Sequence, residues 1–233
     1  MSDNRGEVLS GLESIKSGSL TLDFDPRYAE SLRGKRVAVV GPAETMIGTG
    51  QGGLIDSYDL VVRFNTVIEY LPFSPELSRD IGSRTDILYS NNEVLIEGLV
   101  GQKLISHEKW PEVCERTGIK FVVATNNDFT YAPFSAPPRW YVEYLKLDRF
   151  LDELGGETGF RMLFAVTDTV RRLLKGYVGR TGFIAIFDLL LYDISELYVT
   201  GMTFYHKGGH LFLKDRAPEL HPMKNHRAES PKD

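Results

Sequence analysis

The chain has 233 residues, of which 42% are hydrophobic and 25% are charged, and its formal net charge is -5 at pH 7. This composition supports one sizeable hydrophobic core. The negative charge argues against nucleic acid or an anionic membrane as a partner, so an anionic ligand would need local positive charge.

Cysteine and histidine usage limits the chemistry further. Cys114 is the only cysteine, so no disulfide can form within the chain and no cysteine cluster can bind zinc. The five histidines lack the spacing of a metal site, and we expect neither a metal nor a cofactor. The first 20 residues contain no signal-peptide core and no membrane-spanning segment. We therefore expect a soluble cytoplasmic protein without a membrane anchor, or a protein of the Golgi lumen only if an anchor has been removed.

The pattern of elements predicts a single α/β domain over residues 31–233, preceded by a partly disordered lead-in over residues 1–30. Short apolar runs rich in β-branched residues predict buried strands. Helical spacing of apolar residues predicts helices between them. We expect strands at 36–41, 60–65, 85–89, 120–124 and 197–200, and helices at 8–16, 54–58, 140–154, 159–175 and 182–192. This alternation favours a Rossmann-like, mostly parallel sheet flanked by helices.

A glycine-rich loop follows the first predicted strand, from Gly41 to Gly53. Ligands of open parallel sheets bind beyond the carboxyl ends of the strands, and glycine loops can direct N–H groups at phosphate. Gly48, Gly50 and Gly53 satisfy GxGxxG, but Gly48 lies seven residues past Gly41 instead of at the strand end. A structural loop is an equally good interpretation, and a Rossmann-type oxidoreductase or methyltransferase stays an alternative.

Polar residues near the predicted strands have both structural and functional interpretations. Asp23-Phe-Asp25 matches the DxD pattern of metal-dependent glycosyltransferases, but Pro26 follows it and the first strand comes later, which favours a cap or turn. Asn65, at a strand's carboxyl end, suits a turn former and a ligand contact equally. Arg84 is more typical of a structural ion-pair partner.

The segment KRVAVVGPAETMIGTGQGGLIDSYDLVVRFNT, followed by DIGSRTDILY, resembles the large sialyl motif of the sialyltransferase family. The segment GRTGFIAIFDLLLYDISELYVTGMTFY is similar to the small sialyl motif of the same family. The C-terminal histidines resemble the family's short and very short His-containing motifs. Four elements in the family's order are more specific than any one of them, and together they span about residues 35 to 229.

This resemblance implies an inverting, metal-independent glycosyltransferase with a single-domain, GT-A-like variant of the α/β fold. Its members transfer sialic acid, or a related 2-keto sugar acid, from a CMP-activated donor to a hydroxyl of a glycan or glycoconjugate acceptor. A noncatalytic CMP- or glycan-binding relative is a further alternative. By position in the motifs, the residues implied to contact the CMP donor are Gly41, Pro42, Ala43, Asn65, Thr181 and Gly182.

The resemblance also places two catalytic histidines. Such a reaction needs a base for the attacking hydroxyl, and imidazole titrates in the right range. His226, with Glu229 three residues later, fits the very short motif and is the expected base, while His221 is the rival. His210 falls where the family has the histidine that assists the leaving phosphate, where negative charge develops.

Overall fold

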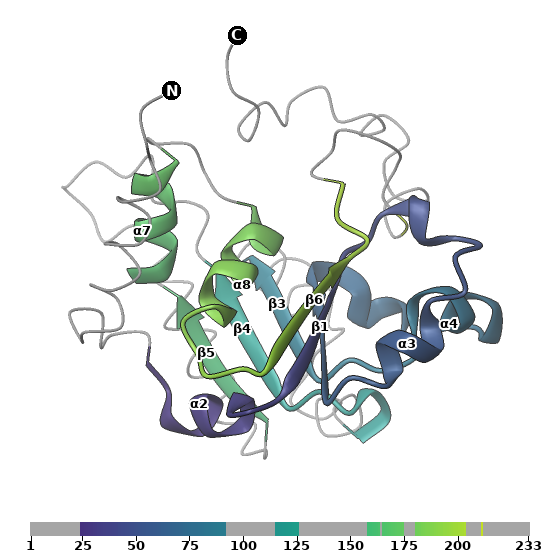
Figure 1. The fold of residues 1–233 in the computed structure, drawn as a ribbon, viewed down its shortest axis with the longest axis horizontal. Helices are drawn as coiled ribbons and strands as arrows, with labels where there is room; N and C mark the ends of the chain where they lie inside the picture. Colours follow the sequence, from purple (N-terminus) through teal and green to yellow (C-terminus); the bar gives the residue numbers. More distant parts are fainter. Residues whose placement is uncertain are drawn as a thin grey trace, which may run out of the picture.

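The computed structural model describes residues 24–91, 115–125, 158–163, 165–174, 180–203 and 211. Across these ranges the chain forms a six-stranded sheet in the order β5-β4-β3-β2-β1-β6, and every neighbouring pair is parallel (Figure 1). The predicted α/β fold with a mostly parallel sheet is therefore confirmed.

The strands are β1 (Arg36–Val40), β2 (Leu60–Phe64), β3 (Ile87–Asn91), β4 (Phe121–Thr125), β5 (Gly159–Leu163) and β6 (Glu196–Thr200). The helices are α2 (Pro26–Leu32), α3 (Gly52–Asp56), α4 (Pro75–Ile81), α7 (Ala165–Leu173) and α8 (Thr181–Leu189), with 3-10 turns η3 (Glu44–Met46) and η4 (Asn65–Tyr70). The helices predicted at 8–16 and 140–154 lie outside the described residues. Within the described residues, no helix is long and apolar enough to cross a membrane.

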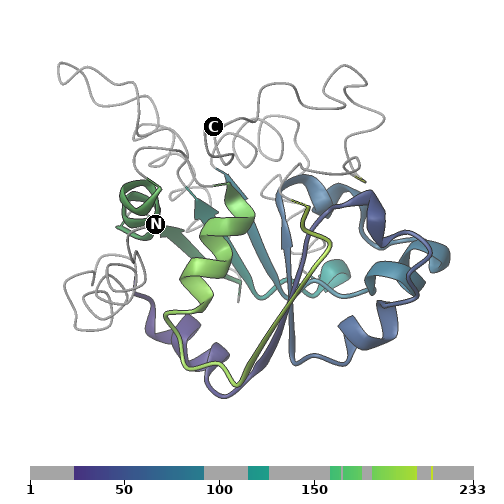
Figure 2. The same ribbon diagram turned by 45° about the horizontal axis from the view of Figure 1, so that its top comes forward.

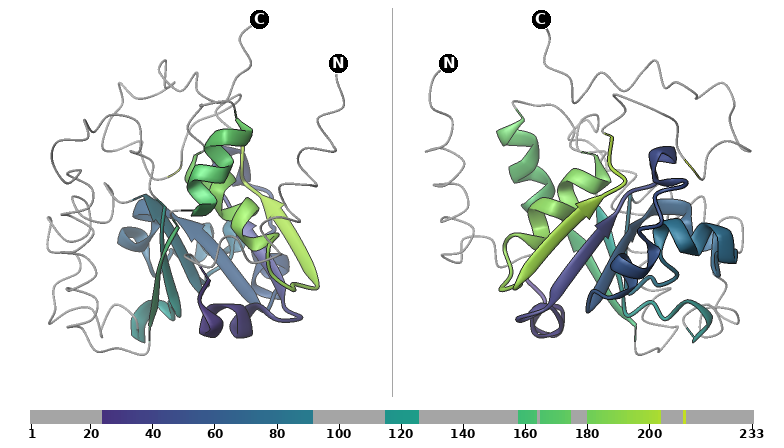
Figure 3. Two further views of the ribbon diagram at one scale, coloured as in Figure 1. Left: turned by 90° about the vertical axis from the view of Figure 1, so that its left-hand side faces the viewer. Right: turned by 45° about the vertical axis from the view of Figure 1, so that its right-hand side comes forward.

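Helices cover both faces of the sheet, because successive side chains of each buried strand point to opposite sides. In β1, Val37 and Val39 belong to the hydrophobic cluster that includes residues of α2, α7 and α8. Ala38 and Val40 belong to a second cluster, with residues of α3 and α4. Two rotated views show these helices on opposite faces of the sheet (Figures 2 and 3).

The helix predicted over 159–175 is wrong in its first part, because residues 159–163 form strand β5. Leu163 packs in the α8-side cluster, whereas Phe160 and Met162 pack in the α3-side cluster. This alternation belongs to a strand buried on both faces. The apolar residues also fit helical spacing, so periodicity alone could not separate the strand from helix α7 that follows it.

Helix α2 precedes the sheet and joins the core. The Asp25 carboxylate accepts hydrogen bonds from the main-chain N–H groups of Arg27 and Tyr28, which confirms the predicted capping role of Asp25. Tyr28 and Leu32 are fully buried. The helix spans position 30, where the lead-in was expected to end, and its buried residues lie on both sides of that position.

A buried ion pair ties α8 to the sheet. Arg161 Nη1 on β5 lies 2.9 Å from Asp188 Oδ2 on α8, and neither side chain is more than 2% exposed. The same carboxylate oxygen accepts a hydrogen bond of 2.6 Å from the Tyr89 hydroxyl on β3. Tyr28 adds a hydroxyl contact of 2.6 Å to Tyr89 and a ring beneath the Arg161 guanidinium. Burial, and then the charge of Asp188, raises the pKa of Tyr89, so this hydroxyl stays protonated and donates.

Candidate functional site: the carboxyl edge of the sheet

Because all six strands are parallel, their carboxyl ends lie at one edge of the sheet. The chain passes from β1 through β5 in one direction and then returns to place β6 on the other side of β1. The order therefore reverses between β1 and β6, and ligands of open α/β sheets bind at such a switch point. Five of the six residues predicted to contact the donor follow β1 or β2 or begin α8, and the sixth, Gly182, is the second residue of that helix.

Two of these residues meet around one methionine. A Cβ atom on Gly41 would lie 2.2 Å from Gly201 O and 2.5 Å from Met202 Cγ. A Cβ atom on Gly182 would lie 2.1 Å from Met202 Cε and 3.8 Å from Phe64 Cζ. Only glycine permits these approaches without displacing the neighbours. The end of β1 and the start of α8, far apart in sequence, are therefore packed against the same side chain at the sheet edge.

The N–H groups of Gly41 and Ala43, in the turn after β1, donate to main-chain carbonyls at the end of β6 and just after it. Gly41 N donates to Thr200 O at 2.8 Å, and Ala43 N donates to Gly201 O at 3.0 Å. Pro42 has no N–H group, and its carbonyl accepts from Leu211 N at 2.7 Å. These bonds extend the pairing of β1 with β6 past the strand ends. A ligand at this turn would consequently meet carbonyls and side chains, because the amides of Gly41 and Ala43 are engaged.

The later part of the glycine loop encloses a carboxylate. Asp80, on α4 and only 3% exposed, accepts hydrogen bonds from Gly48 N at 2.7 Å and Gly50 N at 2.9 Å. These two N–H groups lower the pKa of Asp80. The amides that a dinucleotide-binding loop would offer to phosphate are thus occupied by the protein's own anion. This contact argues against the Rossmann-type cofactor alternative and supports the interpretation of a structural loop.

An Asp80→Asn variant is expected to be less stable than the wild type at neutral pH, with a difference that shrinks in acid. Because the folded-state pKa of Asp80 is lowered, its carboxylate contributes stability above about pH 4 and loses that contribution as the pH falls through the folded-state pKa. Thermal unfolding from pH 7 to pH 3 measures this convergence. Glu30→Gln, at an exposed pair with Arg33, is the control. A difference that is independent of pH would contradict the assignment.

Asn65 follows the last residue of β2 and has an unusual backbone. Its φ angle is 53°, in the left-handed region where asparagine is one of the better tolerated residues. Its Oδ1 atom accepts hydrogen bonds from Asn91 N at 3.2 Å and from Ser90 Oγ at 3.4 Å, both on β3. Thr125 Oγ1 on β4 continues the row by donating to Ser90 O. The sequence pattern did not predict Ser90, Asn91 and Thr125, although each lies at or next to a strand's carboxyl end.

Helix α8 begins at this edge with Thr181 and Gly182, both buried. Arg180 occupies the N-cap position and makes no side-chain capping bond. The first N–H groups of a helix have no partner within it, and the helix dipole makes this end favourable for an anion. The start of α8 therefore has the electrostatic character that the resemblance assigns to a contact with the donor phosphate.

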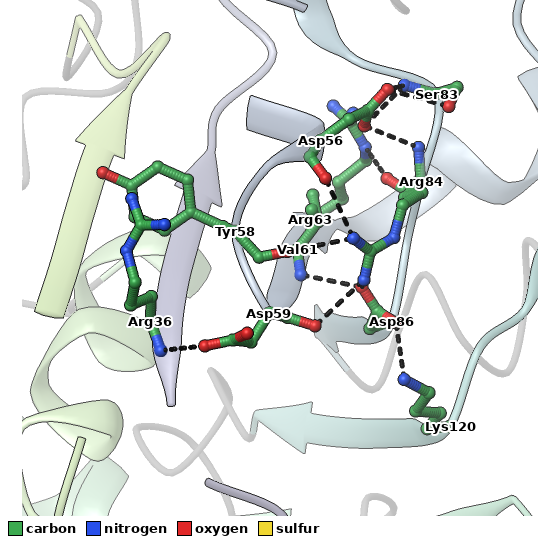
Figure 4. A network of polar contacts seen from close by, with 10 residues as sticks. All are labelled: Arg36, Asp56, Tyr58, Asp59, Val61, Arg63, Ser83, Arg84, Asp86 and Lys120. Carbon is green, nitrogen blue, oxygen red and sulfur yellow. Dashed lines mark hydrogen bonds and ion pairs between the residues drawn. The ribbon is translucent and has the colours of Figure 1, made fainter. Parts of the chain in front are cut away.

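The Gly-Ser-Arg-Thr turn lies at the opposite edge, where the strands begin (Figure 4). Arg84 donates to the main-chain carbonyls of Asp56, Tyr58 and Asp59 at 2.9–3.0 Å. It also pairs with the Asp86 carboxylate at 2.9 Å. The predicted ion-pair role of Arg84 is confirmed. Its contacts join the residues just before β2 to Asp86, which lies just before β3.

Arg63 is likewise structural, although it lies on β2 close to Asn65. It is 2% exposed and donates to the carbonyl oxygens of Ile81, Gly82 and Arg84. Burial lowers the pKa of Arg63 to about 10, still above neutrality, so the guanidinium remains charged. Its bonds to Ile81 O and Gly82 O satisfy carbonyls at the end of α4.

His210, His221 and His226 are outside the described residues, so their predicted roles rest on the sequence alone. The structure therefore brings Gly41, Pro42, Ala43, Asn65, Thr181 and Gly182 to one edge of the sheet, and the catalytic pair stays a prediction.

Comparison with known proteins assigns the family. The sequence profile of glycosyltransferase family 29 (sialyltransferase) matches residues 6–134, more than half of the 233 residues. A mammalian sialyltransferase solved in complex with Gal-beta-1-3GalNAc-ortho-nitrophenol is 16% identical, with a TM-score of 0.49 over 88% of this chain and 69% of that chain. A second mammalian sialyltransferase structure is 18% identical, with a TM-score of 0.44 over 89% and 68%. A comparison with curated protein sequences returned no match. On the family profile, the chain belongs to glycosyltransferase family 29, the sialyltransferases.

Proposed function

We propose that the chain transfers sialic acid, or a related 2-keto sugar acid, from a CMP-activated donor to a hydroxyl of a glycan or glycoconjugate acceptor. The reaction is inverting and uses no metal. Membership of the sialyltransferase family supports the class of reaction. We propose the donor, the stereochemistry and the catalytic residues in addition to this class of reaction.

One observation carries the donor assignment. Gly41, from the large-motif segment, and Gly182, from the small-motif segment, both pack against Met202 at the switch point of the sheet. The two segments assigned to the donor by resemblance therefore lie side by side at this edge of the sheet. The start of α8 is favourable for an anion, because the first N–H groups of a helix have no partner within it, and Asn65 follows β2, the strand adjacent to β1. This arrangement suits a nucleoside monophosphate bound at the carboxyl ends of β1 and β2.

The chemistry requires two further groups. His226 accepts the proton of the acceptor hydroxyl as it attacks the anomeric carbon, and the bond from that carbon to the phosphate oxygen breaks. His210 donates a hydrogen bond to the departing phosphate of CMP, where negative charge accumulates. Both roles come from the order of the sequence motifs.

A hydrolysis and transfer screen tests the proposal directly. The purified chain is incubated with CMP-sialic acid and a panel of glycans that includes Galβ1-3GalNAc, and released CMP and sialylated product are both measured. EDTA is included in a parallel series, since a metal-independent reaction should keep its rate. Release of CMP with formation of product supports the proposal. No product from any CMP-linked sugar acid would contradict it.

A noncatalytic relative that binds CMP is the second candidate. The observation in its favour is that the turn after β1 has used the N–H groups of Gly41 and Ala43 internally and carries Pro42 between them. Protection of the chain by CMP against thermal unfolding, combined with no turnover, would select this candidate. Protection by NAD or S-adenosylmethionine would contradict both.

A further inference from the structure

Helix α8 has an apolar face that points away from the core. Its one charged residue, Asp188, is fully buried in the ion pair with Arg161. Phe183, Ile186 and Leu190 follow helical spacing along one side, and none of them is fully buried. Leu190, at the C-cap, is 48% exposed. A surface helix normally carries polar residues on the side away from the core, so this apolar stripe is typical of a helix with a further neighbour.

Strand β6 extends the apolar stripe of α8. Leu197 and Val199 pair in register with Val37 and Val39, which belong to the α8-side cluster, so all four side chains point to the same face of the sheet. Val199 is 38% exposed. Single exposed apolar residues are ordinary, but a group of them marks a contact surface. The α8 patch consists of Phe183, Ile186, Leu190, Leu197 and Val199.

The sequence before α2 carries a matching stripe. Residues 8–16, which lie outside the described residues, are predicted to form a helix, and Val8, Leu12 and Ile15 fall on one side of it. Ser10 and Ser14 fall on the opposite side. An isolated helix shorter than about 12 residues is marginal in water. This segment therefore requires an apolar surface to pack against.

The position of α2 places that segment within reach of the α8 patch. Gly34 N, just after α2, donates to Asp193 O, just after α8, at 2.7 Å. The rings of Tyr28 and Tyr192 lie 5.3 Å apart, so α2 lies beside the end of α8 (Figure 2). The connection over residues 17–23 spans up to about 23 Å when extended, whereas the nine residues of α8 measure about 13 Å. The segment can therefore lie along the whole outer side of the helix.

We propose that residues 8–16 form an amphipathic helix that docks on the α8 patch through Val8, Leu12 and Ile15. The occupant is thus a segment of the same chain, and the family profile, which begins to match at residue 6, includes it. Docking there covers the outer side of the helix whose start lies at the carboxyl edge of the sheet. This contact goes beyond the proposed function and does not depend on it.

Thiol labelling of the full chain tests whether the patch is covered. In a Cys114→Ser background, Leu190→Cys reports on the patch, and Leu54→Cys reports on α3, on the opposite face of the sheet. Both leucines are 48% exposed, which makes the two positions a matched pair. Relative to the same variants unfolded in urea, maleimide should react about 10-fold or more slowly at position 190 than at position 54, because a docked segment must open first.

Leu12→Asp should reverse this protection. A carboxylate at the centre of the apolar stripe disfavours docking, so the labelling rate at position 190 should rise by about 10-fold, with no change at position 54. Ser14→Asp adds the same charge on the opposite side of the predicted helix and should leave both rates unchanged. Val199→Cys provides a second probe of the patch in case Leu190→Cys itself weakens docking. Thermal unfolding of each variant confirms that it is folded.

The results distinguish the possible occupants of the patch. Slow labelling that is reversed by Leu12→Asp, spared by Ser14→Asp and independent of protein concentration supports the docked segment. Equal labelling at positions 190 and 54, with Val199→Cys labelled as fast, would show an uncovered patch and overturn the proposal. Protection that survives Leu12→Asp would also overturn it, and would assign the patch to a second copy of the chain if it grew with protein concentration. Reversal by both Asp variants would contradict the predicted orientation and overturn the proposal as well.

Discussion

An Asp188→Ala variant is expected to lose about 3–5 kcal/mol of the free energy of unfolding, the usual cost of removing one partner of a buried ion pair. Asp188 is fully buried and holds Arg161 at 2.9 Å and the Tyr89 hydroxyl at 2.6 Å. Without it, a buried guanidinium keeps its charge and loses its counterion. Urea unfolding followed by circular dichroism measures the loss, and the variant should show an earlier midpoint with a similar slope.

An exposed ion pair on the neighbouring helix provides the control. Asp168 on α7 pairs with Arg171 and Arg172, whose side chains are 38% and 78% exposed. Asp168→Ala should cost only about 0–1 kcal/mol, because water replaces such a pair. Replacing both buried partners, as Arg161→Met with Asp188→Leu, should recover part of the loss by removing the unpaired charge. A loss for Asp188→Ala no larger than that of Asp168→Ala would contradict the importance of the buried pair.

The sequence predicted the sheet well where each strand was short, apolar and followed by a glycine or polar residue. β1 and β2 fell within one residue of the expected ranges. The structural role of Arg84 was also predictable, since a charged residue in a tight turn before a strand usually has local partners. Asp86 is only two residues away from it.

Other features depend on distant partners that no local pattern records. The role of Arg63 depends on main-chain carbonyls about 20 residues later, at and just after the end of α4. The spacing of Gly48 and Gly50 resembles that of a phosphate-binding loop. The local sequence does not show that their N–H groups bind the Asp80 carboxylate on α4, about 30 residues later. The strand at β5 was hidden by apolar spacing that also fits the helix after it. In each case the tertiary contact, and not the local sequence, decides between the alternatives.

A His226→Ala variant is expected to lose sialyl transfer by about 10²- to 10⁴-fold, the contribution typical of a general base. The proposed base acts on the acceptor hydroxyl, whereas the residues assigned to CMP follow β1 and β2 or begin α8. The Kd for CMP should therefore stay within about 2-fold of the wild type, which locates the defect in kcat. Single-turnover transfer and calorimetry with CMP measure the two quantities on the same preparation.

The neighbouring histidine makes this prediction selective. His221, only five residues away, is the rival base, and His221→Ala keeps the other histidine in place. If His226 is the base, the wild-type rate should fall in acid as imidazole becomes protonated, and His221→Ala should retain that profile. If instead His226→Ala keeps full activity and His221→Ala loses it, the base is His221, and the register of the very short motif shifts by five residues. Activity that survives both replacements would remove histidine catalysis from this segment, although the proposed CMP site at the carboxyl edge would be unaffected.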